Sequence, residues 1–351
     1  MKRQLRALLA LMLTLGLSLT LGGSAFATVL EPEVISEPFG GYIVKLRAPE
    51  SEVMTLSATP DCLVPILPDM GYYRVDTKED AAALIADGQV EMMEPDYQAE
   101  LFDVPAEPAA PSALAEPVPS KIPNDPAYSK NLQKDLDLIG MNYAWENDLT
   151  GAGVTVAVID SGYTPLHEDA PAKVLPGKYF YYVKDPNGKI ELSGLPGKYT
   201  LKEEADTKEQ IVTKDDYARG HGHGTRVSGV IAAGTNNGKG MIGVAPQVNL
   251  LPVRCFTGTE GHVGGYTSNL VKGIEYAVEQ KADIINMSWG IRANTKMLAD
   301  VVRLTQAAGI LMVAAVGNDG GNAAGSAKPP DMLIYPACYP QVIGVGATKD
   351  N

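Results

Sequence analysis

The sequence predicts an α/β protein with a parallel sheet covered by helices on both faces, preceded by a small α+β domain. From residue 124 onward, apolar strand patterns alternate with amphipathic helix patterns, which is typical of a parallel sheet whose crossovers are helical. Before that point, a shorter run of strand and helix patterns ends in a stretch rich in proline and alanine. A basic start followed by an apolar segment opens the chain. These three observations divide the chain into four parts.

Composition places the chain among ordinary globular proteins. Its 351 residues are 45% hydrophobic and 20% charged, enough for one large domain and a small one. Because 42 acidic residues outnumber 29 Lys and Arg, the net charge is −13, the wrong sign for following nucleic-acid phosphates. We therefore exclude nucleic acid as a partner. Cys62, Cys255 and Cys338 are too widely spaced for a disulfide framework or a CxxC metal site, and we expect all three to be buried.

The first part, residues 1–27, has the features of a secretory signal peptide. Lys2, Arg3 and Arg6 precede an apolar run over residues 7–21, and small residues stand at the expected cleavage position. The run is short for a membrane span, although an uncleaved anchor is the alternative. No later segment is long enough to cross a membrane, so we expect a secreted, extracellular protein with no membrane partner after signal cleavage.

The second part, residues 28–103, has the pattern of a small α+β domain. Thr77 is suited to cap a helix that ends at Gly88, which can adopt the left-handed conformation. Strand patterns cover residues 42–46, 72–75 and 90–93. Residues 104–123 carry six prolines with Ala and Glu between them and too few apolar residues for a core. We interpret them as an extended linker.

The last part, residues 124–351, is predicted to hold the parallel sheet. The apolar run 154–159 is typical of a strand buried on both faces. Further strand patterns cover residues 284–287, 310–316 and 342–345, and helix patterns cover residues 267–278 and 297–308. In such sheets, reacting groups gather at the carboxyl ends of the strands.

Three polar residues stand at strand ends or a helix start of this predicted sheet. Asp160 directly follows the strand 154–159, where a carboxylate is costly unless it orients a base or holds a metal. His223 stands among glycines before an amphipathic helix, as a catalytic base would. Asn318 follows a strand and can donate to an oxygen that acquires negative charge. A turn or capping role for Asp160, and a turn for Asn318, are the alternatives.

These residues lie in motifs that resemble those of the subtilisin-like serine peptidases, or subtilases. Residues 156–162 resemble the family's aspartate motif, residues 223–229 its histidine motif and residues 313–318 its oxyanion-asparagine motif, in the family's order. Further matching segments are residues 243–246, 286–290 and 335–347. Residues 28–103 also resemble the family's propeptide. The resemblance covers about residues 124–351 and implies a subtilisin-like fold.

The resemblance implies a secreted serine endopeptidase that hydrolyses peptide bonds through an Asp–His–Ser triad. Asp160 would orient His223, which would take the proton of the serine and pass it to the leaving amine, and Asn318 would donate to the tetrahedral oxyanion. Polypeptides are the implied substrates, and the chain's own propeptide is the implied inhibitory partner. Segments that resemble the substrate-binding strand and the pocket edge contain Gly264, Gly265, Ser288, Trp289 and Gly290. An ordinary loop and an ordinary strand end are the alternatives.

For metals and cofactors, the resemblance implies no cofactor in the chemistry but suggests a structural calcium site. Asp125, Asp169 and Asn237 resemble family ligands, and their hard oxygen donors suit Ca²⁺. Solvated turn residues are the alternative for this group.

Two departures from the family pattern stand out. No serine lies in a Gly-Thr-Ser-Met-Ala context, so we expect the printed sequence to stop before the nucleophile and to be inactive by itself. A secreted, non-catalytic scaffold or binding protein on the same fold is the alternative. A long polar insert, residues 174–218, either shapes the cleft or decorates the surface.

Two other enzyme classes fit the residues less well. His221 and His223, with Asp160 and His262, could hold zinc, but the Gly-Thr and the helix after His223 favour a base. The Gly-Ala-Gly segment at 151–153 precedes its strand, whereas the glycines of a dinucleotide site follow one.

Overall fold

The computed structural model describes residues 39–47, 62–101, 123–164, 169–184, 199–206, 222–256, 262–263, 265–318 and 333–347. The expected signal peptide, and the expected linker except for its last residue, lie outside these ranges. The chain forms two compact units. The larger contains Glu37–Gly40 and Asp96–Asn351, and the smaller contains Gly41–Pro95.

The smaller unit is built on a four-stranded sheet in the order β2-β3-β1-β4. Its elements are β1 (Phe39–Leu46), β2 (Val64–Leu67), η1 (Pro68–Met70), β3 (Tyr72–Val75), α2 (Lys78–Ala86) and β4 (Val90–Tyr97). Thr77 caps α2 by accepting the Asp80 N–H at 3.1 Å, and Gly88 beyond the helix has a φ of 70°. Val44 and Leu84 lie in a shared core between sheet and helix. The α+β character that the sequence predicts is therefore present.

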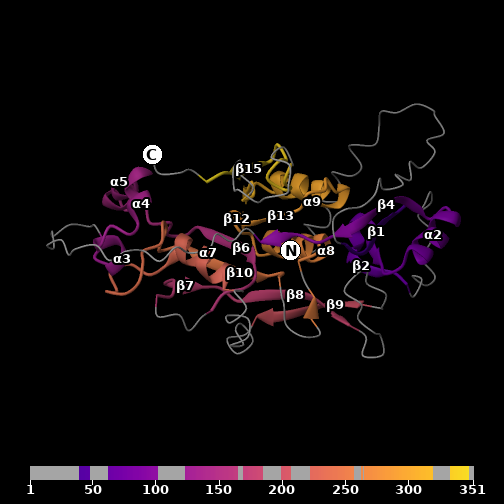
Figure 1. Cartoon of the computed structure of the whole chain (residues 1–351), viewed down its shortest axis with the longest axis horizontal. Coiled ribbons are helices and arrows are strands. Elements are labelled where there is room, and N and C mark those ends of the chain that lie inside the picture. The colour runs from indigo at the N-terminus through magenta and orange to yellow at the C-terminus, as the bar shows by residue number, and fades with distance from the viewer. Residues whose placement is uncertain are drawn as a thin grey trace, which may run out of the picture. The chain divides into compact units, whose positions relative to one another are not determined.

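The larger unit holds a nine-stranded sheet (Figure 1). Its strands are β6 (Thr155–Asp160), β7 (Lys173–Val174), β8 (Gly177–Lys184), β9 (Tyr199–Asp206), β10 (Asn249–Arg254), β11 (His262–Val263), β12 (Ile284–Met287), β14 (Leu311–Ala315) and β15 (Val342–Val345). The order is β11-β8-β10-β6-β12-β14-β15, with β7 beside β10 and β9 beside β8. The five strands from β10 to β15 along this path are parallel, which confirms the predicted fold class.

Alternate residues of β6 contact helices on opposite faces of the sheet. The helices of the unit are α3 (Pro126–Ser129), α4 (Lys134–Leu138), α5 (Met141–Glu146), α7 (His223–Ala232), α8 (Thr267–Glu279) and α9 (Lys296–Ala307). Val156 and Val158 pack in one cluster with Ala232 of α7. On the other face, a Cβ at Gly273 of α8 would lie 3.2 Å from Ile159 Cγ2. Because successive side chains of a strand point to opposite faces, β6 is buried by both helices.

The insert, residues 174–218, contributes two strands to this sheet. β8 pairs antiparallel with β9 along its whole length, from Gly177 to Lys184. It also pairs parallel with β10, where Tyr179 lies opposite Arg254. Tyr179, Phe180 and Tyr181 are buried. A buried strand of the main sheet is not surface decoration, so that half of the expectation was wrong.

The three cysteines are free and differ in exposure. Cys255 is buried, Cys62 is half-buried and Cys338 is exposed. The expectation of three buried thiols therefore holds for Cys255 alone. Cys338 lies in the turn that precedes β15.

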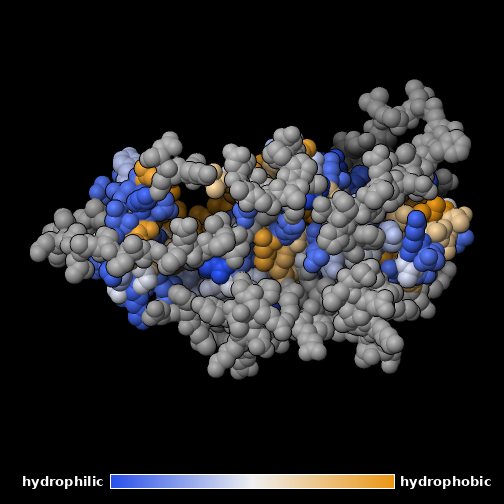
Figure 2. Space-filling model, in the orientation of Figure 1, coloured by the Kyte–Doolittle hydropathy of each residue, from blue (hydrophilic) through white to orange (hydrophobic). Residues whose placement is uncertain are grey.

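Apolar side chains reach the surface on the short helices α4 and α5. Leu138 is 78% exposed, Ile139 66% and Tyr143 72%. In Figure 2 this region is mainly hydrophilic with hydrophobic residues among the polar ones. Among the described helices, none has the length and apolar character that crossing a bilayer requires.

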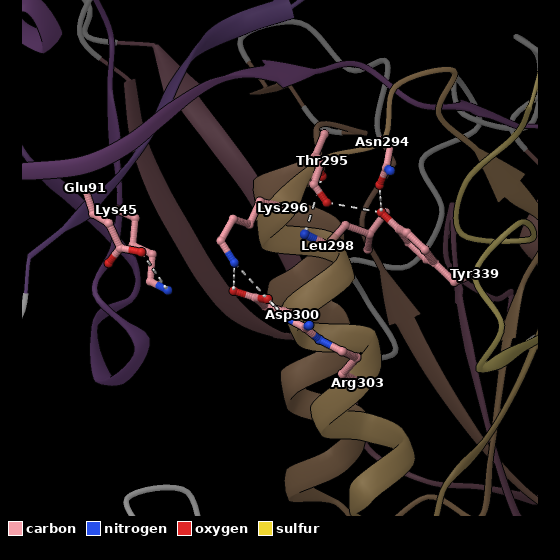
Figure 3. A network of polar contacts seen from close by, with 9 residues as sticks. All are labelled: Lys45, Glu91, Asn294, Thr295, Lys296, Leu298, Asp300, Arg303 and Tyr339. Carbon is pink, nitrogen blue, oxygen red and sulfur yellow. Dashed lines mark hydrogen bonds and ion pairs between the residues drawn. The ribbon is translucent and has the colours of Figure 1, made fainter. Parts of the chain in front are cut away.

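A polar network fixes the start of α9 (Figure 3). Thr295 caps the helix by accepting the Leu298 N–H at 3.4 Å. The Tyr339 hydroxyl lies 3.1 Å from both the Asn294 Oδ1 and the Thr295 carbonyl oxygen. The ion pairs drawn in the same view are Lys296–Asp300, Arg303–Asp300 and, within the smaller unit, Lys45–Glu91. Through Tyr339, the turn before β15 is tied to the N-terminus of α9.

Two helix positions test this packing. Leu270 of α8 is fully buried, whereas Val230 of α7 is 52% exposed. Leu270→Ala should lower the free energy of unfolding by about 2–5 kcal/mol, because it leaves a cavity under the sheet. Val230→Ala should change it by no more than about 0.5 kcal/mol. Urea titrations followed by far-UV circular dichroism measure both, and equal losses would contradict the placement of α8.

Candidate active site

Asp160 and His223 form a buried pair. Asp160 is the last residue of β6 and is fully buried, and His223 opens α7 with 4% of its surface exposed. The His223 Nδ1 atom lies 2.8 Å from Asp160 Oδ1 and 2.9 Å from Oδ2. Because a carboxylate accepts, Nδ1 is the protonated nitrogen and the basic lone pair is on Nε2. The geometry is that of a base oriented by a carboxylate.

Close packing of β6 against α7 makes this pair possible. The Ser161 N–H donates to Asp160 Oδ1 at 2.6 Å, and the Gly224 N–H donates to Ser161 Oγ at 3.0 Å. A Cβ at Gly224 would lie only 2.2 Å from the Gly162 carbonyl oxygen. The helix can therefore begin this close to the strand only with glycine after His223.

Cys255 connects the end of β6 to the segment that follows β11. Its N–H donates to the Asp160 carbonyl at 2.8 Å, and its carbonyl accepts the Gly265 N–H at 2.7 Å. Burial, with a smaller contribution from the negative charge of Asp160, raises the pKa of the Cys255 thiol. The thiol therefore stays protonated at neutral pH and is no nucleophile. Cys255 contributes to the site through its backbone N–H and carbonyl groups.

Residues 98–101 lie in extended conformation between two segments of the larger unit. On one side, the Ala99 N–H donates to the Gly265 carbonyl at 2.7 Å, and Gln98 forms a bridge with Tyr266. On the other side, β5 (Glu100–Leu101) pairs antiparallel with β13 (Trp289–Gly290). Backbone pairing on both edges is how a sheet takes up an extended peptide by strand addition. The chain thus places a strand of its own in a peptide-binding arrangement.

Side chains that the sequence analysis did not single out hold this strand. Asp96 accepts from the Ser268 N–H at 3.0 Å and from its Oγ at 2.6 Å, at the start of α8. Arg292 donates to Glu100 at 3.4 Å. A carboxylate is favoured at a helix N-terminus, where N–H groups lack helical partners. Asp96 and Ser268 are 172 residues apart, so no local pattern could have joined them.

The expected substrate-binding residues border the same strand where they are described. Trp289, fully buried, and Gly290 pair with β5, and Ser288 directly precedes them. Gly265 lies on the opposite edge with a φ of 85°, a value that favours glycine. Gly264 lies outside the described residues. The two segments expected to bind substrate are thus brought to the two edges of one strand.

Asn318 lies at the same end of the sheet as Asp160. It follows β14 by three residues and is exposed. Both β14 and β6 run parallel to their common neighbour β12, so all three strands end at one edge. This edge is where parallel sheets place reacting groups.

The expected metal ligands meet through hydrogen bonds. The Asp125 carboxylate accepts the N–H groups of Asn236 and Asn237 at 2.8 and 3.1 Å. The Asp169 carboxylate accepts from Asn237 Nδ2 at 2.8 Å and from the Met241 N–H at 2.7 Å. Their oxygens are hard donors of the kind that calcium prefers, so the residues fit a calcium ion in chemistry. The described contacts of Asp125 and Asp169, however, are hydrogen bonds to residues 236–241.

Of the residues in the zinc alternative, His223 and Asp160 are in contact, and of His262 the structure describes the backbone. His221 lies outside the described residues. Within the described ranges, no three His, Cys, Asp or Glu side chains are grouped so that they could hold a metal ion.

Comparison with known proteins gives a consistent set of relatives. Residues 151–351 match the sequence profile of the subtilase family. The chain is 35% identical over 218 residues to the major intracellular serine protease of Bacillus subtilis (strain 168), covering 62% of this chain and 58% of that protein. It is 32% identical over 219 residues to the minor extracellular protease Epr of the same organism, covering 62% of this chain and 27% of that protein.

One solved structure is similar in fold. The crystal structure of fervidolysin from Fervidobacterium pennivorans, a keratinolytic enzyme related to subtilisin, superposes with a TM-score of 0.60 at 22% identity. The match covers 90% of this chain and 44% of that one. The chain therefore spans less than two thirds of the length of each of these three proteins.

Two glycines of α7 test the close approach at the site. Gly224→Ala should lower the free energy of unfolding by about 1–3 kcal/mol, because the new Cβ meets the Gly162 backbone. Gly229→Ala is the matched control, since its Cβ would meet only Met241 Sδ at 3.7 Å. That control should gain about 0.5–1 kcal/mol from reduced chain entropy. Urea unfolding separates the two, and a neutral Gly224→Ala would contradict the packing described.

Proposed function

The chain belongs to the subtilase family, and on that basis we propose that the whole protein is a serine endopeptidase acting on polypeptides in extended conformation. The buried contact between His223 Nδ1 and Asp160 is the observation that carries the proposal. The paired edges around residues 98–101 supply the second requirement, a place for a peptide backbone.

In the proposed mechanism, His223 acts as general base and then as general acid. Its Nε2 takes the proton of a serine hydroxyl while the serine oxygen attacks the substrate carbonyl carbon. Asp160 holds the ring and stabilises the imidazolium that forms. The same proton then passes to the leaving amine as the peptide bond breaks. A water molecule repeats the sequence on the acyl-enzyme and releases the carboxylate product.

Asn318 is proposed as the side-chain donor to the oxyanion. Its amide can donate to the carbonyl oxygen as that oxygen becomes negative in the tetrahedral intermediate. The exposed position of Asn318 at the carboxyl edge of the sheet supports this role.

The nucleophile is proposed to lie in the whole protein outside residues 1–351. None of the serines in residues 124–351 stands in the family's Gly-Thr-Ser context. These are Ser129, Ser161, Ser193, Ser228, Ser268, Ser288 and Ser326. Under this proposal the printed chain supplies the base, its orienting carboxylate and the peptide-binding edges.

Residues 28–103 are proposed to be a propeptide that inhibits the enzyme until it is removed. The contacts of residues 96–101 support this, because they occupy both peptide-binding edges. Asp96 at the start of α8 and Glu100 with Arg292 add side-chain contacts. We also propose export of the protein, on the basis of the signal-peptide pattern in residues 1–27.

Hydrolysis assays test the proposed activity. The whole protein should cleave an unfolded polypeptide, and His223→Ala should lower kcat by a factor on the order of 10⁶, the loss known for the equivalent change in subtilisin. His167→Ala, which removes a histidine outside the proposed machinery, is the matched control. The printed chain should show no turnover. Cleavage by the printed chain that depends on His223 would place the nucleophile within it, and activity unaffected by His223→Ala would overturn the mechanism.

Calcium at the Asp125–Asp169 loop is a second proposal. A bound ion would stabilise the folded state by mass action, by about 2.7 kcal/mol at a concentration of 100 Kd. Removing calcium with a chelator should therefore lower the Tm of the whole protein. The variant Asp169→Asn should abolish this difference, whereas Asp135→Asn, at an exposed position of α4, should keep it. An unchanged Tm on chelation, with no calcium found by elemental analysis, would show that hydrogen bonds alone close the loop.

A further inference from the structure

The insert strand β8 lies beside the strand that leads into one peptide-binding edge. β11 pairs antiparallel with β8, with Val263 opposite Tyr182 and His262 opposite Val183. Two residues after β11 the chain reaches Gly265, whose carbonyl accepts the Ala99 N–H. We propose that β8 is a positioning element that holds the Gly265–Tyr266 edge in place for an extended peptide. This inference rests on the proposed peptidase function.

The Gly265–Tyr266 edge needs contacts with other segments of the chain to keep its conformation. Gly265 has a φ of 85°, in a region that glycine enters readily and leaves at little cost. Binding a peptide to a mobile edge would require ordering the edge at the same time, which weakens binding. The Gly265 N–H bond to the Cys255 carbonyl restrains the segment at one point. Pairing of β11 with β8 restrains it at a second point, just upstream.

β8 can serve as a support because it is itself fixed to the sheet. Its first half pairs with β10, with Lys178 opposite Val253 and Tyr179 opposite Arg254. β10 in turn pairs with β6, where Arg254 lies opposite Asp160. A continuous ladder thus runs from the proposed catalytic carboxylate, through β10 and β8, to β11.

Aromatic side chains of β8 make contacts on both faces of the sheet. The Arg254 guanidinium carbon lies 4.4 Å from the centroid of the Tyr179 ring, which stacks on Tyr181 at 4.2 Å. Phe180 meets Tyr276 of α8 edge to face at 6.1 Å. Because neighbouring residues of a strand face opposite sides, these contacts hold β8 from above and below. Tyr179 is therefore proposed as a positioning residue, acting through β8.

Hydrogen exchange of the whole protein, carrying His223→Ala in every variant, tests the proposal without any hydrolysis, so a failed peptidase assay would leave its outcome interpretable. In Tyr179→Ala the loss of the stacked ring should loosen β8, and amides of residues 262–268 and 96–101 should exchange at least about tenfold faster. Tyr179→Phe keeps the ring and should exchange like the protein with His223→Ala alone. Amides of β6 and β12 should stay protected in both variants.

A second variant decides the outcome if the amides of β6 also exchange faster in Tyr179→Ala. Val183→Pro places a residue that cannot donate to a ladder in the part of β8 that pairs with β11 on one edge and with β9 on the other, beyond its contact with β10. Val183→Ala is its matched control, because it keeps the backbone N–H. Faster exchange of residues 96–101 and 262–268 in Val183→Pro alone supports the proposal. Unchanged protection there, while β8 itself exchanges faster, overturns it.

Kinetics of the whole protein give an independent measurement. A long peptide that pairs with the Gly265–Tyr266 edge should show a KM raised about tenfold in Val183→Pro. The kcat/KM for an ester of a single amino acid, which does not reach that edge, should be unchanged. Equal losses for both substrates would assign β8 a general structural role and overturn the positioning role.

Discussion

The structure of the larger unit depends on keeping one carboxylate, that of Asp160, away from water. Burying a charge at the end of an apolar strand is costly unless its oxygens are hydrogen-bonded. Here the Ser161 N–H and His223 Nδ1 supply those hydrogen bonds. The His223 contact requires α7 to begin against the end of β6, which in turn requires a glycine at 224. The burial of the Asp160 charge, the glycine at 224 and the position of His223 therefore depend on one another.

The proposed peptide-binding site is built from the backbone of several segments. The strand at residues 98–101 is paired on both edges, and those edges belong to segments that follow β11 and β12. The carboxylate and the peptide site are joined by the backbone of Cys255, which bonds to Asp160 on one side and to Gly265 on the other. Two backbone hydrogen bonds therefore connect the Gly265 segment to the end of β6.

Local sequence patterns predicted the features that local physics determines. The apolar run before Asp160, the glycines around His223 and the Thr77 cap each follow from strand burial, close packing or an unpaired N–H. The strand β8 was missed, because the polar character of the insert as a whole concealed the run Tyr179-Phe180-Tyr181, which has strong strand preference. The contact between Asp96 and Ser268 could not be predicted, since only the fold brings those residues together.

The loop at Asn236 has a consequence for how the chain folds. The bonds from Asn236 and Asn237 to the Asp125 carboxylate span 111 and 112 residues of sequence. Contacts of such long range form late, because the chain entropy lost in closing the loop must first be offset by other contacts. During synthesis, the segment with Asp125 leaves the ribosome well before its partners, and it waits for β6, the insert and α7 to follow. The segment with Asp125 is thus made before the rest of residues 124–351 and is secured among the last of them.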